Sequence, residues 1–160
     1  LHRVDRRQRQ MCIRDRAKVA AEYNVPCILM HNREDKPYTN LMKNVLEDLI
    51  ESINVALDAG VKRENIILDP GIGFAKNYEE NLIVMNNLEQ IVNIGFPVLL
   101  ATSRKSMIGL ALELPVDERV EGTIATTVMG IMKGCKMVRV HDVLENKRAC
   151  IMTDKILKMK

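Results

Sequence analysis

The strongest constraint on the fold is a regular alternation, from Ala17 onward, of short apolar runs with longer segments whose apolar residues recur at helical spacing. Short apolar runs are typical of buried strands, and the longer segments are typical of amphipathic helices. The predicted strands span 26–30, 65–68, 96–100 and 137–140. The predicted helices span 41–59, 78–94, 119–133 and 143–157. Buried strands that alternate with helices pair in parallel under a helical cover, so we predict an α/β protein of about four parallel βα units.

Local signals mark the ends of two of these helices. Asn77 followed by Glu80 has the spacing of a capping box, in which the two side chains satisfy free N–H groups of the first turn. Gly60 and Gly95 stand directly after predicted helices, where glycine adopts the backbone conformation that ends a helix.

The composition excludes several classes of protein. The 160 residues are 47% hydrophobic and 28% charged, which is typical of one globular domain. No apolar run reaches the roughly 18 residues that a membrane span needs, and no signal peptide is visible. The four cysteines have neither the spacing of a zinc site nor that of a disulfide framework. Their thiols are therefore expected to be reduced, and we predict a cytoplasmic protein. The cysteines are Cys12, Cys27, Cys135 and Cys150.

Residues 1–16 differ from the rest of the chain. Their six arginines and two aspartates give a charge of +4, so residues 17–160 carry −1 of the net +3. The segment has neither a helical nor a strand period, and we predict that it is disordered or non-native, with a nucleic-acid-binding arm as the alternative. The domain at 17–160 offers no electrostatic case for a nucleic-acid partner.

Two architectures fit the alternation: an open doubly wound sheet and part of a (β/α)8 barrel. Polar clusters follow the carboxyl end of every predicted strand, where both folds place their active sites. The sequence contains neither GxGxxG nor GxxxxGK[ST], which weakens the nucleotide-binding form of the open sheet. The clusters lie at 30–33, 69–76, 102–109 and 139–142.

The second cluster has the chemistry of a heterocycle site. The carboxylate of Asp69, at the mouth of a strand, can accept two hydrogen bonds from the N–H edge of a ring. Glycines such as Gly73 let a ligand approach the backbone closely, and Phe74 can stack on a ring. The alternative for this segment is a plain β-turn with Phe74 in the core.

The other clusters have the chemistry of anion sites. Arg104 and Lys105 suit a phosphate or a carbonyl oxygen, although adjacent cations are often only solvated. Arg139 and His141 are two residues apart, so in a strand both side chains point to the same side and can hold an anion together. For His31 and Arg33 in the 30–33 cluster, anion binding and simple solvation stay equally open.

Five motifs in this order resemble the dihydropteroate synthases, a pterin-binding family built on a TIM barrel. The resemblance covers about residues 17–160, and the five motifs together are specific although each alone is weak. The motifs are MHNR at 30–33, DPGxGF(x)K at 69–76, SRKxxIG at 103–109, EGT-x-AT at 121–126 and R-x-HDV at 139–143. The resemblance implies that the chain is the C-terminal half of a (β/α)8 TIM barrel.

The resemblance also implies a role for each site residue. The pterin ring is bound by Asp69 and Lys105, in a pocket lined by Met30 and approached closely at Gly73. Ser103 and Phe74 help to form the p-aminobenzoate site, which Arg104 flanks. Arg139 and His141 hold the leaving pyrophosphate. The implied catalytic residues are Lys105, Arg139 and His141.

The implied activity is that of a transferase in folate biosynthesis and a sulfonamide target. It condenses 6-hydroxymethyl-7,8-dihydropterin diphosphate with p-aminobenzoate to give dihydropteroate and pyrophosphate. Mg²⁺ assists such leaving groups, and the family's metal ligand lies in the N-terminal half of its barrel, so no metal ligand is predicted in this chain. The resemblance further implies small-molecule substrates and a homodimer at full length, without a membrane partner.

Three alternatives stay open. A pterin-dependent methyltransferase would share Asp69 but has no reason to combine the motifs at 103–109 and 139–143. A non-catalytic pterin-binding module is compatible with half a barrel, which leaves two parallel-sheet edges unpaired. A structural subunit is disfavoured by the polar cluster at every strand end. We expect the half barrel to lack synthase activity on its own.

Overall fold

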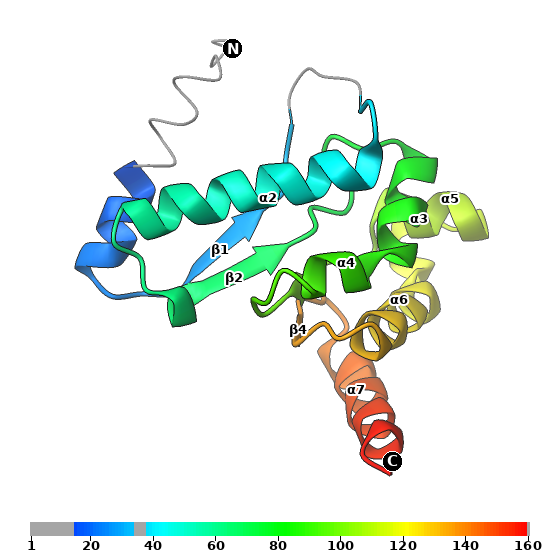
Figure 1. The fold of residues 1–160 in the computed structure, drawn as a ribbon. Coiled ribbons are helices and arrows are strands. Elements are labelled where there is room, and N and C mark those ends of the chain that lie inside the picture. The colour runs from blue at the N-terminus through cyan, green and yellow to red at the C-terminus, as the bar shows by residue number, and fades with distance from the viewer. Residues whose placement is uncertain (1–14, 34–37, 160) are drawn as a thin grey trace.

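The computed structural model describes residues 15–33 and 38–159. A helical stretch at 15–22 leads into four short strands, each followed by helix (Figure 1). The elements are β1 (Cys27–Met30), α2 (Leu41–Asp58), η1 (Arg63–Asn65), β2 (Ile66–Asp69), α3 (Tyr78–Asn86), α4 (Leu88–Val92), β3 (Leu99–Leu100), α5 (Ser106–Leu112), η2 (Val116–Glu118), α6 (Val120–Met132), β4 (Met137–Val138) and α7 (Val143–Leu157).

The strands are parallel and neighbour one another in the order of the chain. β1 pairs with β2 so that Met30 lies opposite Asp69, and β3 pairs with β4. A parallel bridge between Leu68 and Val98 joins the two pairs. The prediction of an α/β fold with parallel strands is therefore confirmed. Consecutive order without a reversal is the arrangement of a barrel, whereas a doubly wound sheet reverses its strand order.

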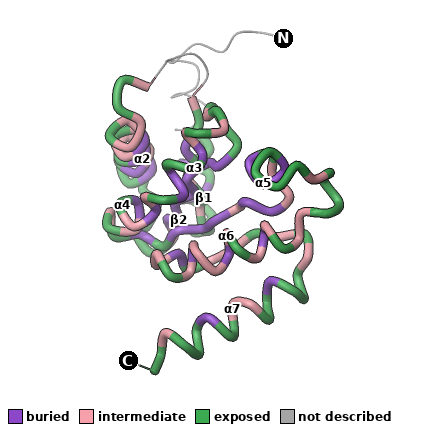
Figure 2. The backbone as a smooth tube through the Cα atoms, turned by 90° about the vertical axis from the view of Figure 1, so that its right-hand side faces the viewer, coloured by how far each residue is buried: buried purple, intermediate pink, exposed green. Residues whose placement is uncertain are grey.

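The core lies between the strands and the helices that cover them. α2 runs alongside β1 and β2 (Figure 1), and its buried stripe includes Val45, Leu49 and Ile53. This stripe belongs to one cluster of buried side chains with Ile66 and Leu68 of β2. The buried segments gather around the strands, whereas α7 packs on α6 and is exposed or half-buried along most of its length (Figure 2).

The capping-box prediction and the Gly60 prediction are confirmed, whereas Gly95 does not follow a helix directly because α4 ends at Val92. Asn77 and Glu80 form the capping box of α3. Gly60 has a φ of +94° after the end of α2, and the backbone N–H groups of Gly60 and Val61 donate to the carbonyls of Leu57 and Ala56. Such paired bonds close a helix end and need a left-handed residue after it.

Four elements differ from their predictions, and the first is the strand predicted at 96–100, which is confined to Leu99–Leu100. The predicted helix 78–94 is broken at Asn87, whose side-chain amide donates to the carbonyl of Ile83 at 2.8 Å. A side chain that occupies a helical carbonyl competes with the backbone for it. The last strand ends at Val138 rather than at residue 140, and the helix α5 had not been predicted.

The segment predicted to be non-native falls mostly outside the described residues. Of residues 1–16, only 15 and 16 are described, and they form the exposed start of the helical stretch 15–22. That stretch places Ala17 and Ala20 in the core. A domain boundary after residue 16 stays a prediction. In the described part of the chain no helix has the length and apolar character needed to cross a membrane.

Candidate active site

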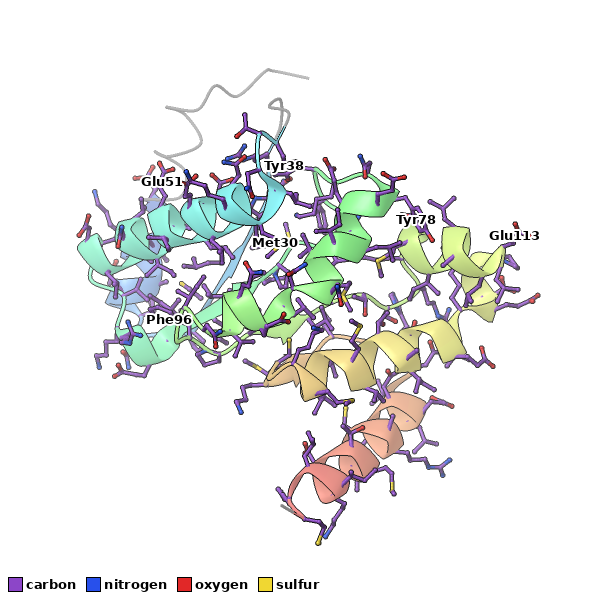
Figure 3. All side chains as sticks on the ribbon, turned by 45° about the vertical axis from the view of Figure 1, so that its right-hand side comes forward. Met30, Tyr38, Glu51, Tyr78, Phe96 and Glu113 are labelled. Carbon is purple, nitrogen blue, oxygen red and sulfur yellow. The ribbon has the colours of Figure 1, made fainter. Side chains whose placement is uncertain are left out.

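The polar clusters predicted at the strand ends meet on one side of the sheet. Asp69 is the last residue of β2, and Met30, the last of β1, is its register partner. Figure 3 shows Met30 below the N-terminal end of α2. Met30 is partly exposed, and its predicted place in a pterin pocket stays a prediction. Parallel strands bring their carboxyl ends to a common edge, which explains why residues 39 positions apart become neighbours.

The loop after β2 folds back onto Asp69. Asp69 is 7% exposed, and its Oδ1 accepts the N–H of Gly71 at 2.8 Å. Gly71 has a φ of +66°, and a Cβ placed on it would lie 1.9 Å from the carbonyl oxygen of His31. Only glycine therefore lets this loop cross the end of β1 so closely. No described residue donates a hydrogen bond to Asp69 Oδ2, which stays available to a ligand.

Burial raises the pKa of Asp69 above its ordinary value, although several neighbours oppose the shift. The opposing causes are the Gly71 N–H and the positive charges of Lys105, Lys76 and Arg139. A carboxylate that loses solvent but faces three cations is prepared to bind a ligand's N–H groups. The motif pattern had indicated Asp69 as such an acceptor.

Lys105 follows the carboxyl end of the neighbouring strand β3 and reaches the same loop from there. Its Nζ donates to the carbonyl of Ile72 and lies 4.4 Å from the ring centroid of Phe74. Burial lowers the pKa of Lys105, while Asp69 raises it and Arg139 lowers it further. The ring of Phe74 is 41% exposed, so the alternative that placed it in the core is wrong. A Cβ on Gly73 would meet the Lys105 side chain at 3.0 Å, so glycine keeps room for this lysine.

Arg139 and His141 both line one cavity, although both lie beyond Val138, the last residue of β4. The cavity has a volume of about 130 Å³. It is lined by Ala101, Ser103, Lys105, Arg139, Val140 and His141. Three basic side chains at one mouth make an anion site chemically plausible.

Ser103 orients the ring of His141. The backbone N–H of His141 donates to Ser103 Oγ at 3.0 Å, and the same Oγ lies 2.9 Å from His141 Nδ1. Ser103 Oγ has a second lone pair as well as its own proton, so it can accept from Nδ1–H or donate to Nδ1, and the contact orients the ring in either tautomer.

Arg104 has a protein partner rather than a free guanidinium. It pairs with Asp142 through Nη2–Oδ1 at 2.6 Å and Nε–Oδ2 at 3.1 Å. The hydrogen bond from Arg104 lowers the pKa of Asp142, which precedes α7 as its cap. Arg104 also has a left-handed φ of +58°. Its predicted place beside p-aminobenzoate stays a prediction, and the observed contact ties the loop after β3 to the start of α7.

The two basic side chains after β1, His31 and Arg33, have protein partners. His31 is 2% exposed, with Nε2 at 3.1 Å from Asp48 Oδ2 and Nδ1 at 2.8 Å from Lys76 Nζ. Arg33 donates from Nη2 to Asp48 Oδ1 at 2.9 Å. Sequence reasoning missed Asp48 in this network. Its signal was a carboxylate directly before buried Leu49 in an otherwise apolar stripe.

The described residues were also compared with the donor set that a metal requires. Residues 15–33 and 38–159 contain no group of three or more His, Cys, Asp or Glu side chains able to hold a metal ion. The chemistry proposed below is assigned to side chains alone.

Comparison with known proteins gives consistent matches to one family. The family described as "Pterin binding enzyme" matches residues 9–141, which begins within the segment expected to be non-native. The dihydropteroate synthase of Clostridium beijerinckii is 69% identical over 146 residues, covering 91% of this chain and 54% of the relative. That of Bacillus subtilis is 57% identical over 141 residues, covering 88% of this chain and 50% of the relative. The chain thus spans about half the length of these curated relatives.

Solved structures agree with the observed fold. A dihydropteroate synthase from Clostridium difficile, determined in the presence of pteroic acid, has a TM-score of 0.87 at 38% identity, covering 96% of this chain and 65% of that one. The Yersinia pestis dihydropteroate synthase in a sulfonamide drug complex has a TM-score of 0.86 at 31% identity, covering 90% of this chain and 55% of that one. The predicted TIM-barrel architecture, of which this chain forms a part, is confirmed.

Proposed function

The chain belongs to the family of pterin binding enzymes, and on that basis we propose that it supplies the active-site half of a dihydropteroate synthase. The reaction would join the pterin methylene carbon to the amine nitrogen of p-aminobenzoate. The amine lone pair forms the new C–N bond, the C–O bond to diphosphate breaks, pyrophosphate leaves with that electron pair, and the amine loses one proton.

The observation that carries this proposal is a buried carboxylate beside a cavity lined by basic side chains. Asp69 Oδ2 can accept N–H groups from the amino-pyrimidine edge of the ring, while Oδ1 is held by Gly71. Lys105 lines the cavity and also donates to the Ile72 carbonyl in the loop that follows Asp69, so the ring site and the cavity are close together. A substrate with a donor edge at one end and a diphosphate at the other matches this sequence of charges.

We assign the leaving pyrophosphate to Arg139 and His141. Arg139 offers a planar fork of donors, and no described residue accepts a hydrogen bond from its side chain. The Ser103 contact engages Nδ1 of His141 and leaves Nε2, on the other edge of the ring, to face an anion. Donors held in place before the reaction stabilise negative charge as it develops on a leaving group.

Lys105 takes the role of a cation that changes partners. In the unliganded chain its ammonium donates to the carbonyl of Ile72 and lies over Phe74. We propose that the bound pterin ring replaces Ile72 as its acceptor. Phe74, exposed next to this lysine, then offers an aromatic face to the incoming p-aminobenzoate, with Ser103 and Arg104 following the carboxyl end of the neighbouring strand β3.

Further features of the proposal concern the longer protein. The family resemblance implies Mg²⁺, which would help to neutralise the diphosphate, but no step is assigned to it here. A cytoplasmic location and a homodimer also belong to the proposal. Pteroic acid and a sulfonamide are named with the related structures, and we propose the same ligand classes for this site.

A chimera tests the function directly. The matching part of the Clostridium beijerinckii relative, 54% of its length, is replaced by this chain. Formation of dihydropteroate from the pterin diphosphate and p-aminobenzoate is then measured. We expect activity within about tenfold of the parent, and loss of activity in Asp69→Ala. A soluble, folded chimera without activity would contradict the proposal. A chimera that instead transfers a methyl group would favour the methyltransferase alternative.

A further inference from the structure

Lys76 is a largely buried cation whose ammonium has three protein acceptors. Its Nζ lies 2.8 Å from His31 Nδ1, 3.1 Å from the carbonyl oxygen of Gly71 and 3.1 Å from that of Phe74. An ammonium has three N–H donors, so all of them have partners inside the protein. A buried charge is costly unless it is fully hydrogen-bonded. The complete set of acceptors indicates a structural task for this lysine in the loop after β2.

Two lysines hold this loop from different sides. Lys76 binds the carbonyls of Gly71 and Phe74, whereas Lys105 binds the carbonyl of Ile72 between them. The N–H of Gly73 donates to Asn81 Oδ1 at 2.7 Å. When Lys105 turns to a ligand, its hold on the loop is released, and Lys76 still fixes the carbonyls on both sides.

The direction of the Lys76 ammonium is set by His31 and Asp48. Because His31 Nδ1 faces a donor, it must act as an acceptor, and the ring proton lies on Nε2. That Nε2–H donates to Asp48 Oδ2 at 3.1 Å. Asp48 is in turn held by Arg33. The chain of contacts links α2, the end of β1 and the loop after β2.

We propose that Lys76 is a positioning residue for the proposed pterin site: held by His31 and Asp48, its ammonium fixes the backbone of residues 71–74 against the Asp69 carboxylate. This inference deepens the proposed function and rests on it for the identity of the ligand. Lys76 does not need to touch the substrate. Its effect passes through the Gly71 N–H, which donates to Asp69.

The charges around Lys76 predict how the network responds to pH. Burial lowers the pKa of Lys76 to about 8, with Asp69, Glu80 and Asp48 acting to raise it and Lys105 to lower it. The pKa of His31 is lowered to about 4, mainly by burial and next by the charge of Lys76. Asp48 acts to raise this pKa, and Arg33 lowers it slightly further. His31 is therefore neutral at pH 7. Above pH 8 the amine keeps only two N–H donors for three acceptors.

Nitrogen-15 NMR of the complete 160-residue chain tests the inference without any ligand. The chain has three histidines, so the ring signals are few. We expect neutral His31 to carry its proton on Nε2, and its Nδ1 signal to shift with a midpoint near pH 8 as Lys76 titrates. The amide protection factors of Gly73 and Phe74 should fall over the same range.

Three variants separate positioning from general stability. In Lys76→Met the midpoint of the His31 signal near pH 8 should vanish, and the amides of Gly73 and Phe74 should lose protection. Lys76→Arg should recover part of that amide protection. Lys43→Met is the matched control, since Lys43 is an exposed lysine on α2 paired with Glu47 at 3.8 Å. It should leave the His31 signal and the loop unchanged. In the chimera, Lys76→Met should raise the KM for the pterin diphosphate about tenfold, the equivalent of weakening the ligand's hydrogen bonding to Asp69 by roughly 1.4 kcal/mol.

The result that overturns the inference is equally specific. A His31 Nδ1 signal that does not titrate near pH 8 in the wild-type chain excludes the coupling, even if Lys76→Met fails to fold. Loop amides equally protected in Lys76→Met and Lys43→Met, or an unchanged KM, exclude the positioning role. Inactivity of the wild-type chimera counts against the proposed function alone, because the NMR result is obtained without substrate.

Discussion

Replacing Gly71 with alanine should be among the most damaging single changes to this chain. Gly71 lies where the loop after β2 crosses the end of β1. A Cβ there would lie 1.9 Å from the carbonyl oxygen of His31 and 3.0 Å from its carbonyl carbon. The atoms in the way are backbone, and that backbone is fixed because the N–H of His31 donates to the carbonyl of Asp69 at 2.9 Å.

The size of the effect has two parts. The positive φ of Gly71 costs an alanine roughly 1–2 kcal/mol. Relieving the contact requires the loop to move by more than 1 Å or so, which breaks the bond from the Gly71 N–H to buried Asp69 and costs about 1–3 kcal/mol. We therefore expect Gly71→Ala to lower the free energy of unfolding by about 2–5 kcal/mol, a large share of the roughly 5–15 kcal/mol of a typical domain.

Gly60→Ala provides the matched control. Gly60 has an even larger φ of +94°, but a Cβ there would meet only the Ala21 Cβ at 3.6 Å, an ordinary contact. Its cost should be limited to the backbone, roughly 1–2 kcal/mol. Urea denaturation of both variants, followed by circular dichroism, measures the difference. Equal midpoints for the two variants would refute the steric argument, because only the contact with His31 distinguishes them.

Three further predictions concern the site and its support. Asp69→Asn should raise the urea midpoint at pH 7 while abolishing pterin binding. The reason is that burial raises the pKa of Asp69 in the folded protein. The stability that this group contributes is therefore present at low pH and is lost as the pH rises through the folded pKa. A lower midpoint at pH 7 would contradict this. Thr127→Val should cost about 1–3 kcal/mol in urea denaturation, since Thr127 donates at 2.7 Å to Oδ1 of fully buried Asn146. An unchanged midpoint would mean that another donor replaces it. Lys105→Ala in the chimera should raise the KM for the pterin diphosphate far more than that for p-aminobenzoate, and equal increases would reject its assignment to the ring.

The elements that the sequence predicts best are those specified by local signals. Helix α2 was predicted at 41–59 and observed at Leu41–Asp58, because its apolar stripe and the following glycine are both local. The capping box at Asn77 is equally local. The break at Asn87 was missed because it depends on which acceptor one side-chain amide chooses, the carbonyl of Ile83, and the helical pattern continues across it.

Strand limits were predicted less well for a different reason. The apolar run at 137–140 reads as one strand, but ladder pairing with β3 includes only Met137 and Val138. Strand length depends on the partner strand, and β3 has only two paired residues, Leu99 and Leu100. The backbone N–H of Arg139 still donates to the carbonyl of Leu100 at 3.0 Å. The side chains of the proposed anion site therefore begin where the ladder stops.

The residues of the candidate site also fall into two groups, those that the sequence predicts and those that it does not. Strand-end residues could be found from sequence because a parallel fold brings all such ends to one edge. The residues that hold them could not, since His31 contacts Lys76 across 45 positions and Asp48 across 17. Arg104 illustrates the difference: its place in a motif indicated a ligand, whereas its contact with Asp142, 38 positions away, indicates a link between two loops.

The supports of the Asp69 loop all come from within the described part of this chain. Lys76 and Lys105 bind its carbonyls, Asn81 binds the N–H of Gly73, and His31 limits the approach of Gly71. These groups come from three of the four strand ends and from the first turns of α3. A ligand edge bound to Asp69 would thus meet a surface whose backbone is fixed before binding. Such preorganisation reduces the cost of ordering on association, so weak pterin binding should persist in this chain even where turnover requires the rest of a barrel.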